Sequence, residues 1–507
     1  MSRFFVRAAA GLVLISASVV NAQGTRPSAA EIARAVDSLA AQAMAEGFAP
    51  ALGVAIVLDG KTIYSRSHGW ADVTARIPAD EKTLWYTAST SKAFTGFGTS
   101  LLAHQGALRL DAPIKSLLPN VQWHPTVPVD SLTLASFLSH THRVADVAIG
   151  ISGSFTGEIP EPEWPRFISR AARQPNDDLI YSNFGYMVAG MVIDRIRPEG
   201  WRRYLEGNVF EPAGMRETYA RMSVPDPKRI AKPHDYTAAG TYLTLPFYKT
   251  DKTISPAGGH LATLHDLARW TIVQSNGGMI DGRRVFPAEA VATSHRLIAK
   301  QTRDRAKRFA FFDREGWSAG WDIGSYEGEP MVSRFGSYHT TRSHLSFLPG
   351  RRVGVVVMSS GGPTPVTDII AAFAFDLEAG RPDARERAQA RLSELRNQAA
   401  AFRASIKTQD SVRAARQRVP LGHPLSSFAG AYHEPAFGTL TFTLKDGALH
   451  YQWGAAYGIA QIFDGTKQQL RIELAGSGEV VTFNFPVGAE RAQSVEVLGA
   501  TLLRSGR

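Results

Sequence analysis

The 507-residue sequence contains no cysteine. This absence excludes a disulfide, a thiolate nucleophile, an iron–sulfur cluster and a cysteine-ligated zinc site. The sequence also lacks an HExxH motif, so a zinc-protease site of that kind has no support. Beyond the N-terminal region, no stretch approaches the roughly 18 apolar residues that a transmembrane helix needs. Several classes of chemistry are therefore removed at the outset.

Acidic residues are outnumbered by basic ones, 46 against 56, which gives a formal net charge of +10. The excess is concentrated, because residues 381–418 hold ten Lys and Arg against four Asp and Glu. A basic stripe confined to one Arg-rich helix is more typical of a solvated face than of a phosphate-binding surface, and no nucleic-acid motif accompanies it. We therefore expect no nucleic-acid partner.

The first 22 residues have the pattern of a signal peptide. Arg3 and Arg7 precede an apolar run from Ala8 to Val20, and small residues occupy the two positions that a signal peptidase reads. We expect cleavage before Gln23, a secreted or periplasmic protein, and no stable membrane span in the mature chain. An uncleaved membrane anchor is the alternative.

The next part of the chain has the pattern of an α/β domain. Residues 54–64 read as two strands joined by an Asp-Gly turn, and strand character returns at residues 343–348 and 353–358. Between these strands the chain is mostly helical. We therefore expect residues 30–378 to form an antiparallel sheet flanked by helices, together with a helical subdomain.

The C-terminal part is organised differently. Residues 379–420 read as a basic helical linker, either one amphipathic helix or a broken pair. Its apolar residues are spaced by three and four: Leu392, Leu395, Ala399, Phe402 and Ile406. Residues 421–507 contain short alternating strands such as 439–444 and 449–453, which predict a small all-β barrel or sandwich.

The strongest local signal for chemistry is Ser89-Thr90-Ser91-Lys92, at the start of a segment with helical apolar spacing. A serine hydroxyl is a poor nucleophile until a base removes its proton. A lysine three residues later lies on the same helical face, within hydrogen-bond reach, and is such a base when neutral. Ser89 and Lys92 are therefore candidate catalytic residues; a capping serine and a solvated lysine are the alternative.

Tyr181-Ser182-Asn183 precedes a second helical segment and places a phenol and an amide at a loop-to-helix junction. Nearby cations can lower the pKa of a tyrosine enough for it to exchange protons with a serine or a leaving group. Taken alone, Tyr181 fits better as a residue at the edge of the core.

The third element is Arg334-Phe335-Gly336-Ser337, on the strand before the final hairpin. A glycine there lets the backbone approach a ligand, and the N–H group of Ser337 can point at a developing oxyanion. Arg334 can hold a substrate carboxylate. An ordinary edge-strand arginine is the structural alternative.

In this order the three elements resemble the serine β-lactamase and penicillin-binding-protein superfamily, in its class C β-lactamase, D-alanyl-D-alanine carboxypeptidase and esterase branch. The resemblance covers about residues 30–378. Further segments support it: 105–113, 256–259, 266–269 and 354–358. The C-terminal segment is similar to the lipocalin-like accessory domain of some members.

This resemblance implies a role for each candidate residue. Ser89 would be the acylated nucleophile, Lys92 its proton acceptor, and Tyr181 the group that moves protons to the leaving group and activates the deacylating water. Asn183 would hydrogen-bond the substrate's amide. Arg334 and Gly336 would belong to the substrate-binding third motif, and the N–H groups of Ser89 and Ser337 would form the oxyanion hole. No cofactor is implied.

The chain departs from the family's pattern at three places that face the substrate. The third motif, normally Lys-Thr-Gly or His-x-Gly, is Arg-Phe-Gly here, which keeps the charge and loses the hydroxyl. Residues 338–342 replace a small Gly-rich stretch, which should narrow or reshape the site. His140-Thr141-His142-Arg143 stands where relatives have His-Thr-Ser-Gly; because no third ligand falls nearby, we expect no metal site.

These features predict an exported serine hydrolase that acts through an acyl-enzyme on amide, peptide or ester bonds of a small-molecule or peptide substrate. D-amino-acid peptidase, carboxypeptidase and esterase activities remain open, with weak β-lactamase activity. The alternative is a penicillin-binding-type sensor or scaffold with little turnover, which would use the β-domain as its binding module. The oligomeric state stays open.

Overall fold

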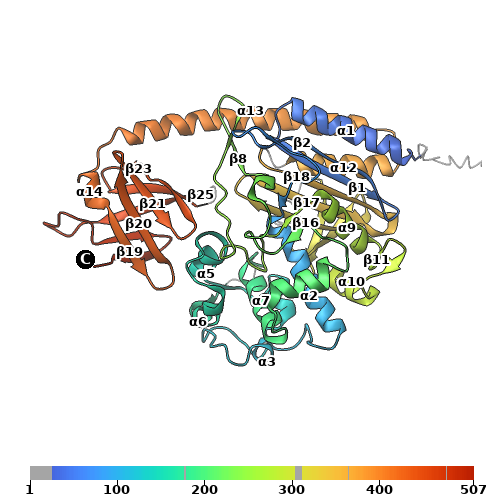
Figure 1. Cartoon of the computed structure of the whole chain (residues 1–507), viewed down its shortest axis with the longest axis horizontal. Helices are drawn as coiled ribbons and strands as arrows, with labels where there is room; N and C mark the ends of the chain where they lie inside the picture. The colour runs from blue at the N-terminus through green and yellow to red at the C-terminus, as the bar shows by residue number, and fades with distance from the viewer. Residues whose placement is uncertain (1–25, 176–178, 303–310, 363–364, 475–476, 507) are drawn as a thin grey trace, which may run out of the picture.

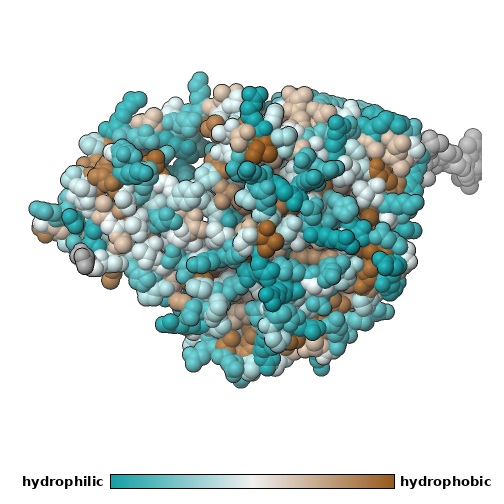
Figure 2. Space-filling model, in the orientation of Figure 1, coloured by the Kyte–Doolittle hydropathy of each residue, from teal (hydrophilic) through white to brown (hydrophobic). Residues whose placement is uncertain are grey.

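The computed structural model describes residues 26–506 apart from 176–178, 303–310, 363–364 and 475–476. The expected signal peptide at residues 1–22 lies outside the described residues. Within the part of the chain that is described, every helix falls short of the length or apolar character that a membrane crossing requires. On the face drawn in Figure 2, apolar side chains form small separate patches between polar ones.

A nine-stranded antiparallel sheet forms the centre of the larger domain, in the order β13-β14-β15-β16-β17-β18-β1-β2-β3. It joins the two ends of the domain, because β1 pairs with β18 in a register that places Val54 opposite Val357. The antiparallel sheet expected from the sequence is therefore confirmed. The strands are β1 (Ala51–Leu58), β2 (Lys61–Asp72), β3 (Ile77–Pro78), β13 (Ala299–Lys300), β14 (Asp313–Trp317), β15 (Asp322–Tyr326), β16 (Glu329–Tyr338), β17 (Thr341–Leu348) and β18 (Val353–Ser359).

The expected Asp-Gly hairpin joins β1 to β2. Asp59 and Gly60 have φ values of 50° and 74°, so both residues adopt the left-handed conformation that a type I′ turn requires. Every residue of β1 is buried, and its side chains alternate between two apolar clusters. Ala55 and Val57 face one cluster, whereas Val54 and Ile56 face the other.

Helices cover both faces of the sheet (Figure 1). One face carries α1 (Ala29–Ala45) and α12 (Pro365–Glu378), and α9 (Leu264–Ser275) lies on the other beside a helical subdomain. The remaining helices of this domain are α2 (Ser91–His104), α3 (Ile114–Leu117), α4 (Leu134–Leu138), α5 (Val147–Ile151), α6 (Trp164–Phe167), α7 (Phe184–Ile196), α8 (Gly200–Leu205) and α10 (Ala288–His295).

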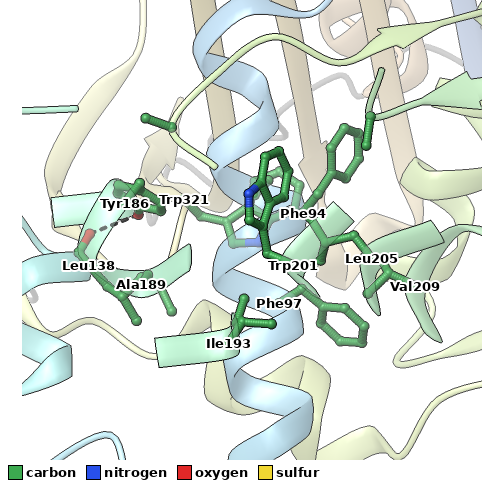
Figure 3. Close-up of a cluster of buried hydrophobic side chains, with 14 of the residues drawn as sticks. Phe94, Phe97, Leu138, Tyr186, Ala189, Ile193, Trp201, Leu205, Val209 and Trp321 are labelled. Atoms are coloured by element: carbon green, nitrogen blue, oxygen red, sulfur yellow. Dashed lines mark hydrogen bonds between the residues drawn. The ribbon is translucent and has the colours of Figure 1, made fainter. Parts of the chain in front are cut away.

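Helix α2 is the centre of the helical subdomain, and all of its residues from Ser91 to Leu102 are buried. Figure 3 shows Phe94 and Phe97 of α2 among side chains from α7, α8 and the segment after β14. Burying each such side chain contributes about 1.5–3 kcal/mol. Gly96 permits a close approach, since a Cβ there would lie 2.1 Å from the carbonyl oxygen of Ala319. The start of α2 is consequently held in a fixed position.

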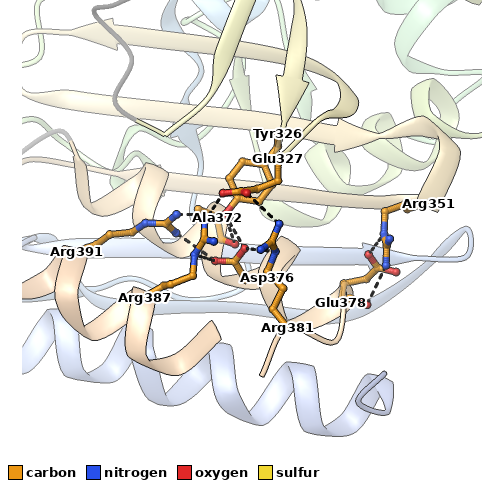
Figure 4. Close-up of polar contacts among 9 residues, drawn as sticks. All are labelled: Tyr326, Glu327, Arg351, Ala372, Asp376, Glu378, Arg381, Arg387 and Arg391. Atoms are coloured by element: carbon orange, nitrogen blue, oxygen red, sulfur yellow. Dashed lines mark hydrogen bonds and ion pairs between the residues drawn. The ribbon is translucent and has the colours of Figure 1, made fainter. Parts of the chain in front are cut away.

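The basic segment forms one helix, α13 (Ala384–Gln417), of 34 residues. Its apolar stripe is buried as far as Ala399, whereas Phe402 is 52% exposed, because there the helix leaves the sheet domain and runs toward the C-terminal domain (Figure 1). Asp376 of α12, fully buried, lies within 3.4 Å of the guanidinium groups of three arginines (Figure 4). These are Arg381, Arg387 and Arg391. Part of the positive charge is therefore used within the molecule.

The C-terminal segment folds into a nearly closed nine-stranded antiparallel barrel, in the order β22-β21-β20-β19-β27-β26-β25-β24-β23. Its core contains Tyr432, Phe442, Trp453 and Phe483. The expected all-β barrel is confirmed; its lipocalin-like character stays a prediction. Its elements are α14 (Leu425–Phe428), β19 (Gly430–Glu434), β20 (Gly438–Lys445), β21 (Ala448–Trp453), β22 (Ala456–Ile459), β23 (Gln461–Asp464), β24 (Gln469–Leu474), β25 (Ser477–Asn484), β26 (Ser494–Val497) and β27 (Ala500–Arg504).

The Asp376 cluster gives a stability prediction. Replacing Asp376 by Asn should lower the free energy of unfolding by about 3 kcal/mol, because three arginines lose their shared carboxylate in a largely buried site. Asp410→Asn is the control, since Asp410 is an exposed carboxylate of the neighbouring helix α13 that pairs with Arg413 at 3.6 Å, and its loss should cost less than about 1 kcal/mol. Urea unfolding followed by circular dichroism measures both; equal shifts would contradict the prediction.

Candidate active site

Ser89 lies in a short 3₁₀ turn, Ala88–Thr90, that leads directly into α2. Ala88 has a φ of 46°, so a non-glycine residue next to Ser89 adopts the left-handed conformation, a form of strain that clusters at functional sites. Thr87 anchors the turn, because its hydroxyl shares a hydrogen bond of 2.8 Å with the Ser91 hydroxyl and donates one of 2.9 Å to the carbonyl oxygen of His260. The packing of α2 thus fixes the serine.

The Lys92 amine lies one helical turn from Ser89 and is fully buried. Its Nζ donates to Ser89 Oγ at 3.2 Å, to Asn183 Oδ1 at 2.7 Å and to the carbonyl oxygen of Ala257 at 2.5 Å. These acceptors come from three separate segments. They aim the amine at the serine hydroxyl, which is the geometry that the Ser-x-x-Lys spacing predicts.

Tyr181 lies beside this pair, at the loop that precedes α7. Its Oη accepts a hydrogen bond of 2.8 Å from Arg334 Nη2, and Lys92 Nζ lies 5.1 Å from the centre of its ring. Asn183 follows, and its Nδ2 donates to Ser154 Oγ at 3.3 Å while its Oδ1 holds Lys92. The structure therefore brings Ser89, Lys92, Tyr181 and Asn183 together.

Burial and charge place the pKa values of the two proton-transfer candidates close together. Burial lowers the pKa of Lys92 to about 8, and the charge of Arg334 contributes to this lowering. Burial opposes ionisation of Tyr181, but the charges of Arg334 and Lys92 outweigh it and lower the pKa of Tyr181 to about 8. Either group can consequently accept a proton from Ser89 in mildly alkaline water.

Arg334 is 1% exposed, and its donors point toward protein groups. Its Nε donates to the carbonyl oxygen of Ser89 at 3.0 Å, and its Nη1 lies 3.4 Å from Asp322 Oδ2. Together with the bond to Tyr181, these contacts favour a role in setting the charge of Tyr181. They leave the expected role of Arg334, holding a substrate carboxylate, without direct support.

Gly336 lets β16 approach the serine. A Cβ at this position would lie 2.5 Å from the carbonyl oxygen of Thr87 and 2.8 Å from the Ser89 nitrogen, so a larger residue would push the strand away. The pairing of β16 with β15 ends at Ser333, whereas its pairing with β17 continues to Tyr338. The edge of β16 from Arg334 onward therefore faces the Ser89 turn. Ser337 is exposed on it.

A family model for β-lactamase matches residues 36–380. The chain belongs to the β-lactamase family. It is a serine hydrolase of the β-lactamase-like superfamily. Over 334 residues it is 24% identical to penicillin-binding protein 4 of Amycolatopsis lactamdurans, which covers 62% of this chain and 82% of that protein. It spans only 62% of the length of other curated relatives.

Two solved structures of similar fold differ in how much of the chain they cover. The octameric penicillin-binding protein homologue from Pyrococcus abyssi superposes with a TM-score of 0.58 and 19% identity, covering 93% of this chain and 99% of that one. The D-amino acid amidase from Ochrobactrum anthropi, complexed with L-phenylalanine amide, has a TM-score of 0.56 and 19% identity over 71% of this chain and 99% of its own. Both likenesses concern the fold.

A cavity of about 570 Å³ opens at the site of this β-lactamase family member. Its lining among the described residues includes Ser89, Tyr181, Arg334, Gly336 and Ser337, but not Lys92 or Asn183. From there the cavity extends past Phe335 to α12 and α13. Three polar residues of α13 contribute to its far wall: Arg391, Glu394 and Gln398. The helical linker is therefore part of the site.

Several groups that contact the site were not predicted from the sequence. Asp322 pairs with both Arg334 and Arg314, each at 3.4 Å, and the ring centre of Trp317 lies 5.1 Å from the Arg334 guanidinium carbon. The Ala257 carbonyl is a backbone group, so only the Pro-Ala-Gly-Gly segment around it could have indicated it. The contribution of α13 has no local sequence signal at all.

Two other sequence features have structural roles here. His142 is buried, and its Nδ1 accepts from the Val144 N–H at 2.9 Å; His140 Nδ1 accepts from the Ser182 N–H at 3.2 Å, next to Tyr181. Residues 316–320 match the pattern GxSxG, but Ser318 is buried and its hydroxyl donates to the carbonyl of Trp321. It lies in the turn between antiparallel β14 and β15, not between a strand and a helix, so it is no nucleophile elbow.

The charge of Arg334 gives a pH prediction. If a base with a pKa near 8 must lose its proton before Ser89 attacks, the rate rises with pH through about 8. Arg334→Gln removes a cation that lowers the pKa of both Lys92 and Tyr181, so the rise should move to higher pH by about one unit.

The measurement is the pH profile of kcat/KM. Arg334→Lys keeps a cation while the introduced side chain is protonated, so it should shift the rise less than Arg334→Gln does. Arg342→Gln removes another cation that lines the same cavity and should leave the position of the rise unchanged. A profile for Arg334→Gln that coincides with that of the wild type would contradict the assignment.

Proposed function

We propose that this serine hydrolase cleaves amide bonds of small D-amino-acid amides and peptides through an acyl-enzyme on Ser89. The observation that carries the proposal is the buried Lys92 amine, which is held 3.2 Å from Ser89 Oγ and has its pKa lowered to about 8. The likeness of the fold to a D-amino acid amidase supports the substrate class. Ester turnover and weak β-lactamase activity belong to the same chemistry.

In the proposed acylation step, Ser89 Oγ attacks the substrate carbonyl and its proton passes to Lys92 Nζ. The N–H groups of Ser89 and Ser337 stabilise the oxyanion. The carbon–nitrogen bond breaks as the leaving amine receives a proton through Tyr181. In deacylation the Tyr181 phenolate accepts a proton from water as the water oxygen attacks the ester carbonyl; the bond between that carbon and Ser89 Oγ then breaks, and Tyr181 returns the proton to Ser89 Oγ. Asn183 holds Lys92 and contacts the substrate's amide.

The cavity bears on which substrates fit. The guanidinium of Arg334 donates hydrogen bonds to the Ser89 carbonyl and the Tyr181 hydroxyl. The guanidinium carbon of Arg314 lies 3.8 Å from the centre of the Phe335 ring. A fused β-lactam has a carboxylate that would need a cation at this position. We therefore propose that amides and short peptides are preferred over β-lactams. Export through the N-terminal segment is part of the proposal.

Acylation of Ser89 is the first test. Intact-mass spectrometry after treatment with a fluorophosphonate should show one adduct that maps to the peptide containing Ser89, and Ser89→Ala should show none. Ser337→Ala is the control, because the proposal uses only its backbone N–H and the adduct should persist. The absence of an adduct in the wild type, or its presence on another peptide, would overturn the proposal.

Turnover separates the hydrolase from a slow-acylating sensor. D-phenylalanine amide should be hydrolysed by the wild type faster than L-phenylalanine amide. Tyr181→Phe should lower kcat for it by about a hundredfold or more with little change in KM, because the phenol transfers protons and the ring remains. Stoichiometric acylation without turnover would favour the sensor, and near-normal kcat in Tyr181→Phe would show that Lys92 alone runs the chemistry.

A further inference from the structure

The C-terminal barrel contacts the larger domain at residues 152–158, the segment after α5. The Ala455 N–H donates to the carbonyl oxygen of Thr156 at 2.8 Å, and the Thr439 N–H donates to Glu158 Oε2 at 3.2 Å. Nearby, the Tyr248 hydroxyl donates to the carbonyl oxygen of Tyr457 at 2.7 Å. Two hairpins of the barrel, β19–β20 and β21–β22, therefore hold this segment.

Two glycines of the barrel make this contact possible. A Cβ on Gly454 would lie 2.0 Å from the carbonyl oxygen of Thr156, and a Cβ on Gly438 would lie 2.0 Å from Glu158 Oε2. Both residues have positive φ, of 55° and 74°. The hairpin tips are fitted to the surface of the segment so closely that one added carbon atom would move them.

The other side of the same segment faces the active site. Ser154 Oγ accepts a hydrogen bond of 3.3 Å from Asn183 Nδ2, and Asn183 Oδ1 accepts one of 2.7 Å from Lys92. The Lys249 amine donates to the carbonyl oxygen of Ser154 as well. Ser154 lies two residues before Thr156, whose carbonyl oxygen accepts the hydrogen bond from the barrel. A continuous path of hydrogen bonds and two peptide links thus joins the barrel to Lys92.

The conformation of the segment is of an uncommon kind. Residues 152–156 form a single π-helical turn, which ends at Gly157 with a φ of 72°. Turns of this kind are uncommon and occur frequently at functional sites. The barrel donates one hydrogen bond to the last residue of this turn, Thr156, and one to the side chain of Glu158 just beyond it. These contacts favour the conformation in which Ser154 reaches Asn183.

We propose that the barrel is a positioning domain for the active site: by holding residues 152–158 it keeps Ser154 against Asn183, and Asn183 in turn keeps Lys92 aimed at Ser89. The inference rests on the proposed function, since it concerns how fast Ser89 is acylated. Gly454, Ser154 and Tyr248 are positioning residues in this scheme, and none of them touches the reacting atoms.

The test compares two glycines of the barrel in the full-length chain. Gly454→Ala introduces the Cβ that meets Thr156, whereas Gly447→Ala places a Cβ where nothing lies within 4 Å. Gly447 also has a positive φ, of 75°, so both variants carry similar backbone strain. The second-order rate constant for fluorophosphonate labelling of Ser89 should fall by roughly tenfold to a hundredfold in Gly454→Ala, and by less than about twofold in Gly447→Ala.

A double-mutant cycle distinguishes positioning from simple stabilisation. Ser154→Ala should show a loss of similar size, and Gly454→Ala should add nothing further in that background. Tyr248→Phe, which removes a barrel contact without backbone strain, should show a smaller loss that also disappears in the Ser154→Ala background. The pH profile of labelling should change in Gly454→Ala, because the Asn183 oxygen that accepts from Lys92 is no longer held in place. If the contact were merely structural, Gly454→Ala would change the melting temperature and leave the pH profile as it is in the wild type.

The outcomes separate the two proposals. A wild type that fluorophosphonate does not label overturns the proposed function and this inference with it. A labelled wild type, with Gly454→Ala reacting at the same rate, overturns the positioning role alone. Losses that multiply in the double variants would show that the barrel acts by a route that does not pass through Ser154.

Discussion

The interaction on which the site depends is the burial of the Lys92 amine among oxygen acceptors. Removing an ammonium group from water costs several kcal/mol unless polar partners replace the solvent. Here the partners are the hydroxyl of Ser89, the side-chain oxygen of Asn183 and the carbonyl of Ala257. Each belongs to a different segment, so the loops before α2, before α7 and before α9 must all be in place together. The same burial lowers the pKa of Lys92, which makes the amine available as a base.

Arg334 adds a second constraint to this electrostatic arrangement. A guanidinium keeps its charge throughout the working pH range of an enzyme, whereas a lysine in the same buried place could lose its proton. The charge that lowers the pKa of Tyr181 is therefore constant. Asp322 lies 3.4 Å from Arg334 and supplies a negative charge beside the buried cation, although it shares its carboxylate with Arg314.

The sequence was sufficient for most of the framework. The Asp59-Gly60 turn and the valine-rich strands predicted the paired ends of the sheet, since local turn chemistry and alternation are properties of neighbouring residues. The spacing of Ser89 and Lys92, and the position of Tyr181 before a helix, predicted groups that the fold does bring together. The contacts of Arg334 could not be predicted, because they depend on the register between β15 and β16, which places Asp322 opposite Ser333. The acceptor at Ala257 is a backbone oxygen and leaves no trace in residue type. The stripe on α13 was correctly seen, but its burial stops at Ala399, where tertiary packing ends.

The length of helix α13 constrains how the two domains are placed. Residues 391–398 in its first half line the cavity beside Ser89, and its last turns lead into the barrel, so one helix affects both the shape of the site and the place of the second domain. Each residue inserted into an α-helix advances the remainder of the chain by about 1.5 Å and rotates it by about 100°. A single insertion between Ala399 and Gln417 would thus turn the barrel hairpins away from Thr156, whereas an insertion of seven residues would restore their direction and leave them about 10 Å too far along. The length of this helix is consequently restricted by both domains at once, and its second half also makes specific contacts, such as those of Arg403 with Tyr236 and of Arg416 with the ring of Phe463.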